Sequence, residues 1–304
     1  MVSARAWAGF LGLSVLWGVP YLFIKVAVDD GVPPIFLAWV RVTLAAIVLL
    51  GLAWRAGTLR SPRGQRTWVV GYAILEICLP FPLIGAGERH VSSSLTAILI
   101  AAVPTFIALL SLRFQPEERL TRTRAAGLAV GFGGVIALVG LDIGGDSDEL
   151  LGAGAILLAA FGYACGPMIY QRRFSGLDVR ATMGAALAAA AVILAPFALT
   201  NPPDELTGDA AISLVVLGIF CTAAAFALFA LLIVWIGAAR TSIITYVAPV
   251  VALACGVAFL DESIGPGTIV GLVLIIAGSW LSTDGRLPTS ALARRRAQRA
   301  ASLR

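Results

Sequence analysis

The sequence predicts an all-α integral membrane protein with ten transmembrane helices, arranged as two inverted five-helix repeats around a central cavity. Three observations predict this fold: a low charge content, long apolar segments along the whole chain, and a pattern that recurs halfway along it. Of the 304 residues, 59% are hydrophobic and 13% are charged. A soluble domain carries about 25% charged residues, so the composition indicates a membrane environment.

The apolar segments have the length that a bilayer requires, because a helix needs about 20 residues to cross the hydrocarbon core. The first segment follows Arg5 and is longer than the apolar part of a secretory signal, so we expect a permanent span there. We expect ten spans in all, at residues 6–28, 34–54, 68–87, 92–112, 125–141, 150–170, 181–199, 211–235, 241–260 and 266–282.

The connections between these spans alternate in charge. Of the 22 basic residues, 19 fall at the N-terminus, in every second connection or in the C-terminal tail, whereas the remaining connections are rich in Asp and Glu. Cytoplasmic loops of membrane proteins are enriched in Lys and Arg. We therefore expect a multi-pass protein of the cytoplasmic membrane with both termini in the cytoplasm. The net charge of +5 belongs to loops and tail, and it indicates no nucleic-acid partner.

The two halves of the chain share a pattern of residues. Three residues recur 145 positions later, namely Thr96, Ile98 and Pro104 as Thr241, Ile243 and Pro249. Three more recur after 144 positions, namely Glu118, Gly127 and Gly134 as Glu262, Gly271 and Gly278. Five spans is an odd number, so the second copy would enter the membrane upside down, as in many transporters. The predicted units are a first repeat at 1–141, a second at 150–284 and a basic cytoplasmic tail at 285–304.

The chain resembles the EamA-type transporters of the drug/metabolite transporter superfamily. The most specific stretch is residues 237–252, GAARTSIITYVAPVVA, followed by Leu260-Asp261-Glu262. Matching pieces of the first half are Trp17-Gly18, Lys25, Arg41, residues 94–104 and residues 118–121. The resemblance implies a central cavity and alternating access without ATP hydrolysis. It implies no single substrate, because members move amino acids, drugs, nucleotide sugars and other metabolites.

Glu76 falls near the middle of the third expected span. A carboxylate at that depth costs about 2.5–3.5 kcal/mol on insertion scales, so it usually faces a cavity or a partner. Tyr72, Glu76 and Pro80 recur every four residues, which predicts one polar stripe along a helix. We predict that Glu76 and Tyr72 line the cavity, where Glu76 binds a substrate amine or a proton. The alternative is a protonated carboxyl that only hydrogen-bonds a neighbouring helix.

Aromatic and hydroxyl residues on other spans complete the predicted substrate-binding set. They are Trp17, Tyr163, Phe226, Thr245 and Tyr246. An apolar cavity with a few polar groups suits a small organic ligand. The alternative for each residue is ordinary packing between helices, in which hydroxyl groups form interhelical hydrogen bonds.

Six further residues are predicted to serve in gating or structure. Lys25 and Arg41 lie inside spans and must pair or reach water, and Asp29 and Asp30 are candidate partners. The matched prolines Pro104 and Pro249 predict equivalent bends, which could act as hinges or as static shape. Glu118 and Glu262 precede the fifth helix of each repeat, where a carboxylate favours the positive helix N-terminus.

These observations favour a secondary transporter that exports an amino acid-like or drug-like metabolite. We expect no catalytic residues, cofactor or metal site, because His90 is the only histidine and the four cysteines lie in apolar segments. A lipid head-group flippase is an alternative within the same fold. A membrane-embedded enzyme acting on a lipid-linked substrate would need clustered Asp, His or Ser near one interface, which the sequence does not show.

Overall fold

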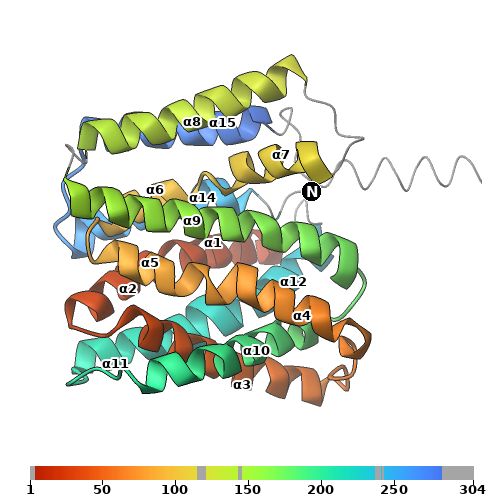
Figure 1. Cartoon of the computed structure of the whole chain (residues 1–304). Coiled ribbons are helices and arrows are strands. Elements are labelled where there is room, and N and C mark those ends of the chain that lie inside the picture. Colours follow the sequence, from red (N-terminus) through yellow and green to blue (C-terminus); the bar gives the residue numbers. More distant parts are fainter. Residues whose placement is uncertain (1–3, 115–120, 143–145, 237–240, 242, 283–304) are drawn as a thin grey trace, which may run out of the picture.

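The computed structural model describes residues 4–114, 121–142, 146–236, 241 and 243–282, and these residues form helices and short connections without strands. The helices run roughly parallel and antiparallel to one another (Figure 1). They form ten helical segments in the described ranges, which we number in chain order. The fold class predicted from composition is thus confirmed as all-helical.

The first five segments contain eight α-helices and one π-helical stretch. Segment 1 is α1 and α2, segment 2 is α3, segment 3 is α4, η2 and α5, segment 4 is α6 and α7, and segment 5 is α8. Their bounds are α1 Ala4–Gly18, α2 Pro20–Asp29, α3 Pro34–Arg55, α4 Arg66–Ala73, the π-helical η2 Ile74–Cys78, α5 Pro80–Glu88, α6 Ser93–Ile100, α7 Val103–Phe114 and α8 Arg122–Asp142. A short 3-10 turn, η1 (Arg63–Gln65), precedes α4.

The last five segments follow the same order. Segment 6 is α9 and η3, segment 7 is α10, segment 8 is α11, η4 and α12, and segments 9 and 10 are α14 and α15. Their bounds are α9 Ser147–Ile169, the π-helical η3 Tyr170–Phe174, α10 Val179–Leu199, α11 Gly208–Val215, the π-helical η4 Val216–Ala224, α12 Ala225–Ile236, α14 Ile244–Phe259 and α15 Pro266–Ser282.

Eight of these segments are long and apolar enough to cross a membrane, namely segments 1 to 8. The other two, Ile244–Phe259 and Pro266–Ser282, are apolar but have only 16 and 17 residues. The ten spans predicted from sequence therefore have counterparts in position, but the last two are shorter than a full crossing within the described residues.

Helix starts follow the capping preferences of the sequence. Ser92, Asp146, Asp178 and Thr207 each accept a hydrogen bond from the first turn of the helix that follows, as N-cap side chains do. Asp178 also pairs with Arg180, 2.7 Å from Nη2 to Oδ2. That hydrogen bond holds the pKa of the Asp178 carboxyl below its usual value.

Helix boundaries recur along the chain at a fixed spacing. Pairs of boundaries lie 145 positions apart: the starts of α3 and α10 at Pro34 and Val179, the starts of η1 and α11 at Arg63 and Gly208, and the ends of α7 and α14 at Phe114 and Phe259. The π-helical stretches η2 and η4 also occupy matching segments, 3 and 8. The repeat read from single residues is thus present in the helices themselves.

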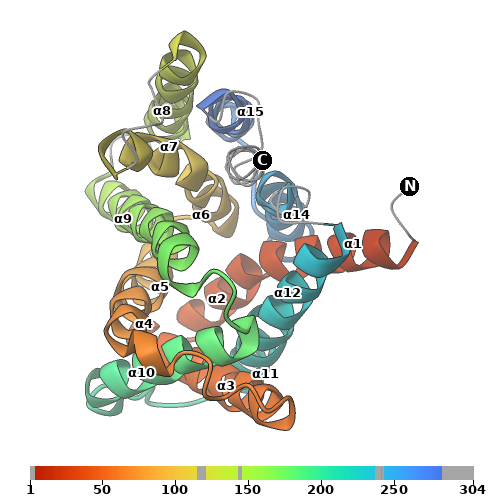
Figure 2. The ribbon, with the colours of Figure 1, turned by 90° about the vertical axis from the view of Figure 1, so that its right-hand side faces the viewer.

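Two helix pairs form opposite edges of the molecule. The α8–α15 pair lies at one edge and the α3–α10 pair at the other, in both views (Figures 1 and 2). Each pair joins matching segments of the two halves, 5 with 10 and 2 with 7. The other six segments pack between these edges. There α5 packs on α9 while α1 packs on α12, and α6 packs on α9 while α14 packs on α1.

Glycines allow the α8–α15 pair to approach closely. A Cβ atom at Gly278 would overlap the backbone of Gly131, and one at Gly127 would overlap the backbone at Ser282. Gly134 and Gly271 likewise lie against the facing helix. Small residues at such contacts are typical of helix pairs in membranes. The glycines that match between the two halves are therefore interface residues.

Polar contacts of the connections fall into two groups, one at each end of the helices. At the end we call the acidic end, Thr207 Oγ1 donates to Asp30 Oδ2 at 2.5 Å, and the Gly267 amide donates to Asp142 Oδ1 at 2.9 Å. At the other, the basic end, Arg124 Nε donates to the Ser282 carbonyl at 3.2 Å, and Arg173 lies over the Trp68 ring at 4.1 Å. The connections that the sequence separates by charge thus lie at opposite ends of the helices.

Candidate functional site

Glu76 lies in the π-helical stretch η2, between α4 and α5. Its side chain is half-buried, and Oε2 is fully covered without a hydrogen-bond partner among the residues that the structure describes. The carboxylate lies against Gly166 of α9, where a Cβ atom would overlap Oε2. π-Bulges are frequent at functional sites. The predicted four-residue stripe needs correction, because the wider π turn changes the angular spacing between Tyr72, Glu76 and Pro80.

Aromatic rings enclose Glu76 on the side of the basic end. Tyr72 is buried, and its ring lies 6.5 Å from that of Tyr170 and 5.8 Å from that of Phe174. Tyr72 belongs to a buried cluster with Ile77, the residue after Glu76, and Tyr163 packs against the same cluster. The structure therefore brings together three of the predicted site residues, Tyr72, Glu76 and Tyr163, from segments 3 and 6.

Arg41 lies buried on α3 and reaches segment 8. Its Nε donates to Thr222 Oγ1 at 2.8 Å, and its guanidinium lies 4.1 Å from the centre of the Phe81 ring. The Phe81 ring lies 6.4 Å from that of Tyr163. In the described part of the chain, the terminal nitrogens of Arg41 have no hydrogen-bond partner. The sequence predicts Asp29 and Asp30 as partners for both Lys25 and Arg41. The prediction is confirmed for Lys25, which pairs with Asp29 at 3.0 Å, and it is wrong for Arg41, which contacts Thr222.

Trp17 packs against segment 8 from the other half of the chain. Its ring lies 6.3 Å from that of Phe226 and 5.1 Å from that of Phe229. Phe226 also packs against the buried cluster that contains Tyr72. Phe226 thus connects Trp17 to the residues around Glu76. Thr245 and Tyr246 lie half-buried on α14, which packs on α1 beside Trp17.

The matched prolines differ in their surroundings. Segment 4 is interrupted between α6 and α7, and Pro104 is the second residue of α7. By contrast, α14 runs from Ile244 through Pro249 without interruption. The predicted bend is therefore present in segment 4, whereas the described part of segment 9 is continuous at its proline.

The Glu262 carboxylate caps a different helix from the one predicted. It accepts hydrogen bonds from the Ser93 amide at 2.7 Å and the Ser94 amide at 3.0 Å, and also from Ser94 Oγ. It therefore caps α6 of the first half, whereas Asp142 accepts from the first turn of α15. Sequence proximity to α15 suggested the wrong helix, because the capped N-terminus comes from the other half. Glu118 lies outside the described residues.

Glu88 is a buried acid that the sequence did not single out. It ends α5, its side chain has no exposed surface, and neither carboxylate oxygen has a partner among the described residues. Lys25 Nζ donates to its backbone carbonyl at 2.8 Å. The neighbouring Arg89 and His90 made Glu88 resemble a loop residue, and only its position at the end of an apolar run could have signalled burial.

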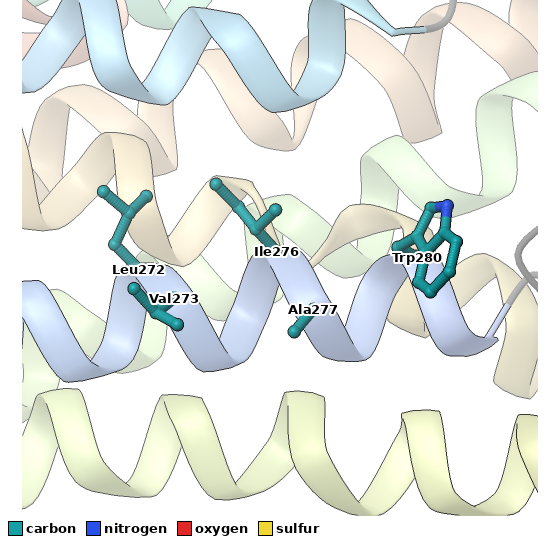
Figure 3. A pocket seen from close by; sticks show the side chains of 5 residues that line it. All are labelled: Leu272, Val273, Ile276, Ala277 and Trp280. Carbon is teal, nitrogen blue, oxygen red and sulfur yellow. The ribbon is translucent and has the colours of Figure 1, made fainter.

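One apolar hollow lies away from all of these residues. It has a volume of about 420 Å³ and is lined by Leu272, Val273, Ile276, Ala277 and Trp280, all from α15 (Figure 3). Trp280 and Val273 are more than half exposed. None of the predicted site residues lines this hollow, so it is not the central cavity predicted from sequence.

Curated relatives of the chain are named as transporters. An uncharacterized transporter, YoaV, of Bacillus subtilis is 25% identical and covers 90% of this chain and 95% of its own length. A probable amino-acid metabolite efflux pump of Salmonella typhimurium is 26% identical, and the match covers 91% of this chain and 95% of the relative. An uncharacterized inner membrane transporter, YedA, of Escherichia coli is 28% identical, and the match covers 90% of this chain and 89% of the relative. None of these names denotes an enzyme.

A solved structure shares the fold, and a family profile identifies the chain. The crystal structure of a protein 23% identical in sequence superposes with a TM-score of 0.64, over 96% of this chain and 99% of that one. The profile of the EamA-like transporter family matches twice, at residues 5–140 and 150–283. These two matches cover both halves and nearly all of the helices. The chain is therefore a multi-pass membrane transporter and belongs to the EamA-like transporter family.

Proposed function

We propose that the protein is a secondary transporter that exports a small, partly apolar, amine-bearing metabolite, such as an amino acid, by alternating access between two inverted repeats. The observation that carries the proposal is the covered Oε2 of Glu76, which has no hydrogen-bond partner among the described residues and lies beside a group of aromatic rings. An unpaired buried carboxylate oxygen costs free energy, so a ligand that donates a hydrogen bond to it would be stabilised.

Glu76 on segment 3 and Arg41 on segment 2 together suit a ligand that carries both an amine and an acid. A substrate ammonium can pair with Glu76, while the free terminal nitrogens of Arg41 offer donors to a carboxylate. Phe81 and Tyr163 lie along the path between the two groups, since Phe81 contacts Arg41 and Tyr163 is within reach of Glu76. Aromatic walls with a few polar groups fit a small organic ligand.

The helix contacts support an inverted arrangement of ten spans. Exchanging the two halves turns several of the larger contacts into other observed ones: α5 with α9 becomes α12 with α1, and α6 with α9 becomes α14 with α1. The same exchange leaves the edge pairs α3–α10 and α8–α15 unchanged, because each joins two matching segments. A two-fold relation between the repeats produces this pattern, and an odd number of spans per repeat requires the inversion.

The direction of transport rests on relatives. The Salmonella typhimurium relative is named a probable amino-acid metabolite efflux pump, which favours export and an amino acid-like substrate here. The test is exchange transport in proteoliposomes loaded with unlabelled L-phenylalanine, L-threonine or phenethylamine and given the labelled compound outside. We expect exchange of at least one amine-bearing compound above empty liposomes. Exchange of none of them, while a carboxylic acid without an amine is exchanged, would contradict the proposed substrate class.

The charge asymmetry predicts that the basic end and both termini lie in the cytoplasm. Reporter fusions after Arg66 and after Glu149 should then report opposite sides of the membrane, with Arg66 inside. A fusion after Arg180 serves as the control and should agree with Arg66. Equal signals from Arg66 and Glu149 would contradict the ten-span topology.

A further inference from the structure

Glu88 ends α5 at the acidic end, enclosed on every side. Gly87 beside it lies against Ile156 and Gly152 of α9 so closely that a Cβ atom would overlap Ile156. α5 also packs on α2 and α3. The Glu88 side chain has no exposed surface, and both carboxylate oxygens lack a partner within the described ranges. This carboxyl is more completely enclosed than that of Glu76, whose side chain is half-buried.

The charged groups that lie near Glu88 already pair or hydrogen-bond with other residues. Lys25 of α2 is paired with Asp29 at 3.0 Å, and it donates to the Glu88 carbonyl rather than to its carboxylate. Arg41 of α3 donates to Thr222, and the Glu262 carboxylate is held at the N-terminus of α6. Tyr21 of α2 is a further neighbour. The facing residues of α9, Gly152 and Ile156, carry no charge.

An ionised Glu88 is therefore incompatible with this arrangement. Burying one unpaired charge costs several kcal/mol even after relaxation. A neutral carboxyl avoids most of that cost. Two changes would allow ionisation: entry of water when the acidic end opens, or movement of Lys25 from Asp29, whose side chain is 54% exposed, to the Glu88 carboxylate.

We propose that Glu88 is a proton-binding site whose occupancy closes the acidic end of the transporter. The bound proton is the one on the carboxyl oxygen, and opening returns it to the water at that end as the carboxylate forms. A proton binds the closed state more tightly than the open one, so proton concentration biases the equilibrium between them. The inference rests on the proposed transport function, to which it adds a dependence on pH at the outer side.

The test measures opening of the acidic end without any substrate. Spin labels are placed on His90→Cys and Ser263→Cys, two exposed positions on different connections at this end, after the four native cysteines are replaced. His90→Cys also removes the only histidine of the chain, so carboxyl groups dominate titration below neutral pH. Pulsed electron resonance then gives the distance distribution as pH is varied.

We expect the labelled parent to shift from a short to a longer distance as pH rises. Glu88→Gln, which imitates the protonated acid, should stay at the short distance throughout. Glu205→Gln, at an exposed acid on another connection of the same end, is the matched control and should shift like the parent. Asp29→Asn frees Lys25 to pair with the Glu88 carboxylate in the closed state, so Glu88 can ionise without opening. The shift in distance should therefore weaken or move to higher pH.

Three results would overturn the inference: no pH dependence in the parent, an unchanged shift in Glu88→Gln, or a shift in Asp29→Asn that is as large as in the parent with the same or a lower midpoint. If Glu88→Gln fails to fold, the Asp29→Asn variant still tests the inference. Because no substrate is present, failure here leaves the proposed Glu76 site intact. Failure of the exchange assay with a pH-dependent distance would instead count against the proposed substrate alone.

Discussion

Gly278→Ala is expected to destabilise the protein by about 3 kcal/mol, near the top of the range for overpacked cores. The added methyl group would overlap the backbone of Gly131. Backbone atoms of a packed helix cannot rotate away as a side chain can, so α8 and α15 would have to separate along their length. The midpoint of thermal unfolding in detergent should fall by about 5 °C or more.

Gly133→Ala is the matched control on the same helix pair. Gly133 lies within α8, and a Cβ atom there meets nothing within 4 Å. Alanine in an open helical position is favoured over glycine by roughly 0.5–1 kcal/mol. The unfolding midpoint should stay constant or rise. If the two substitutions had the same effect, close backbone contact would not be what holds α8 to α15.

Glu76→Gln is expected to reduce transport of an amine-bearing substrate by about 10- to 100-fold at low substrate concentration. The substitution keeps the size of the side chain and removes its charge. A hydrogen bond to a charged group contributes about 1.5–3 kcal/mol, and each 1.4 kcal/mol is tenfold in affinity. The loss should appear in the exchange assay at matched protein amounts, and it should be smaller for an analogue without the amine.

Gly166→Ala tests the same site without changing the carboxyl. Its methyl group would occupy the space of the Glu76 carboxylate, so the acid must move and transport should fall as in Glu76→Gln. Gly154→Ala, on the same helix but facing open space, is the control and should transport normally. Normal transport by Gly166→Ala and Glu76→Gln together would remove Glu76 from the substrate site.

Much of the fold could be predicted because hydropathy and charge act over short distances along the chain. Long apolar segments gave the positions of the helices, and alternate connections rich in Arg gave the two ends. The recurring glycines predicted the repeat, and they now have a physical role in the α8–α15 contact. Each of these signals depends only on neighbouring residues or on a fixed spacing.

The site was harder to predict because its partners are set by contacts between distant segments. Arg41 is held by Thr222, 181 positions away, and Glu262 caps a helix that starts 169 positions earlier. A helical pattern with a period of 3.6 residues cannot anticipate the π turn that carries Glu76. Glu88 was missed because burial at the end of a helix depends on how α9 and α2 pack around it.

The central claim is that the two halves alternate in closing the acidic and the basic end. Two hydrogen bonds between the halves allow a direct test: Ser94 with Glu262 at the acidic end, and Arg172 with the Phe114 carbonyl at the basic end. Cysteine pairs replace Ser94 and Glu262 in one variant, and Phe114 and Arg172 in another, with the native cysteines removed. Exchange transport is then measured before crosslinking, after crosslinking and after reduction. The account predicts that each crosslink alone stops transport and that reduction restores it. High crosslinking yield in both variants with continued transport would contradict it.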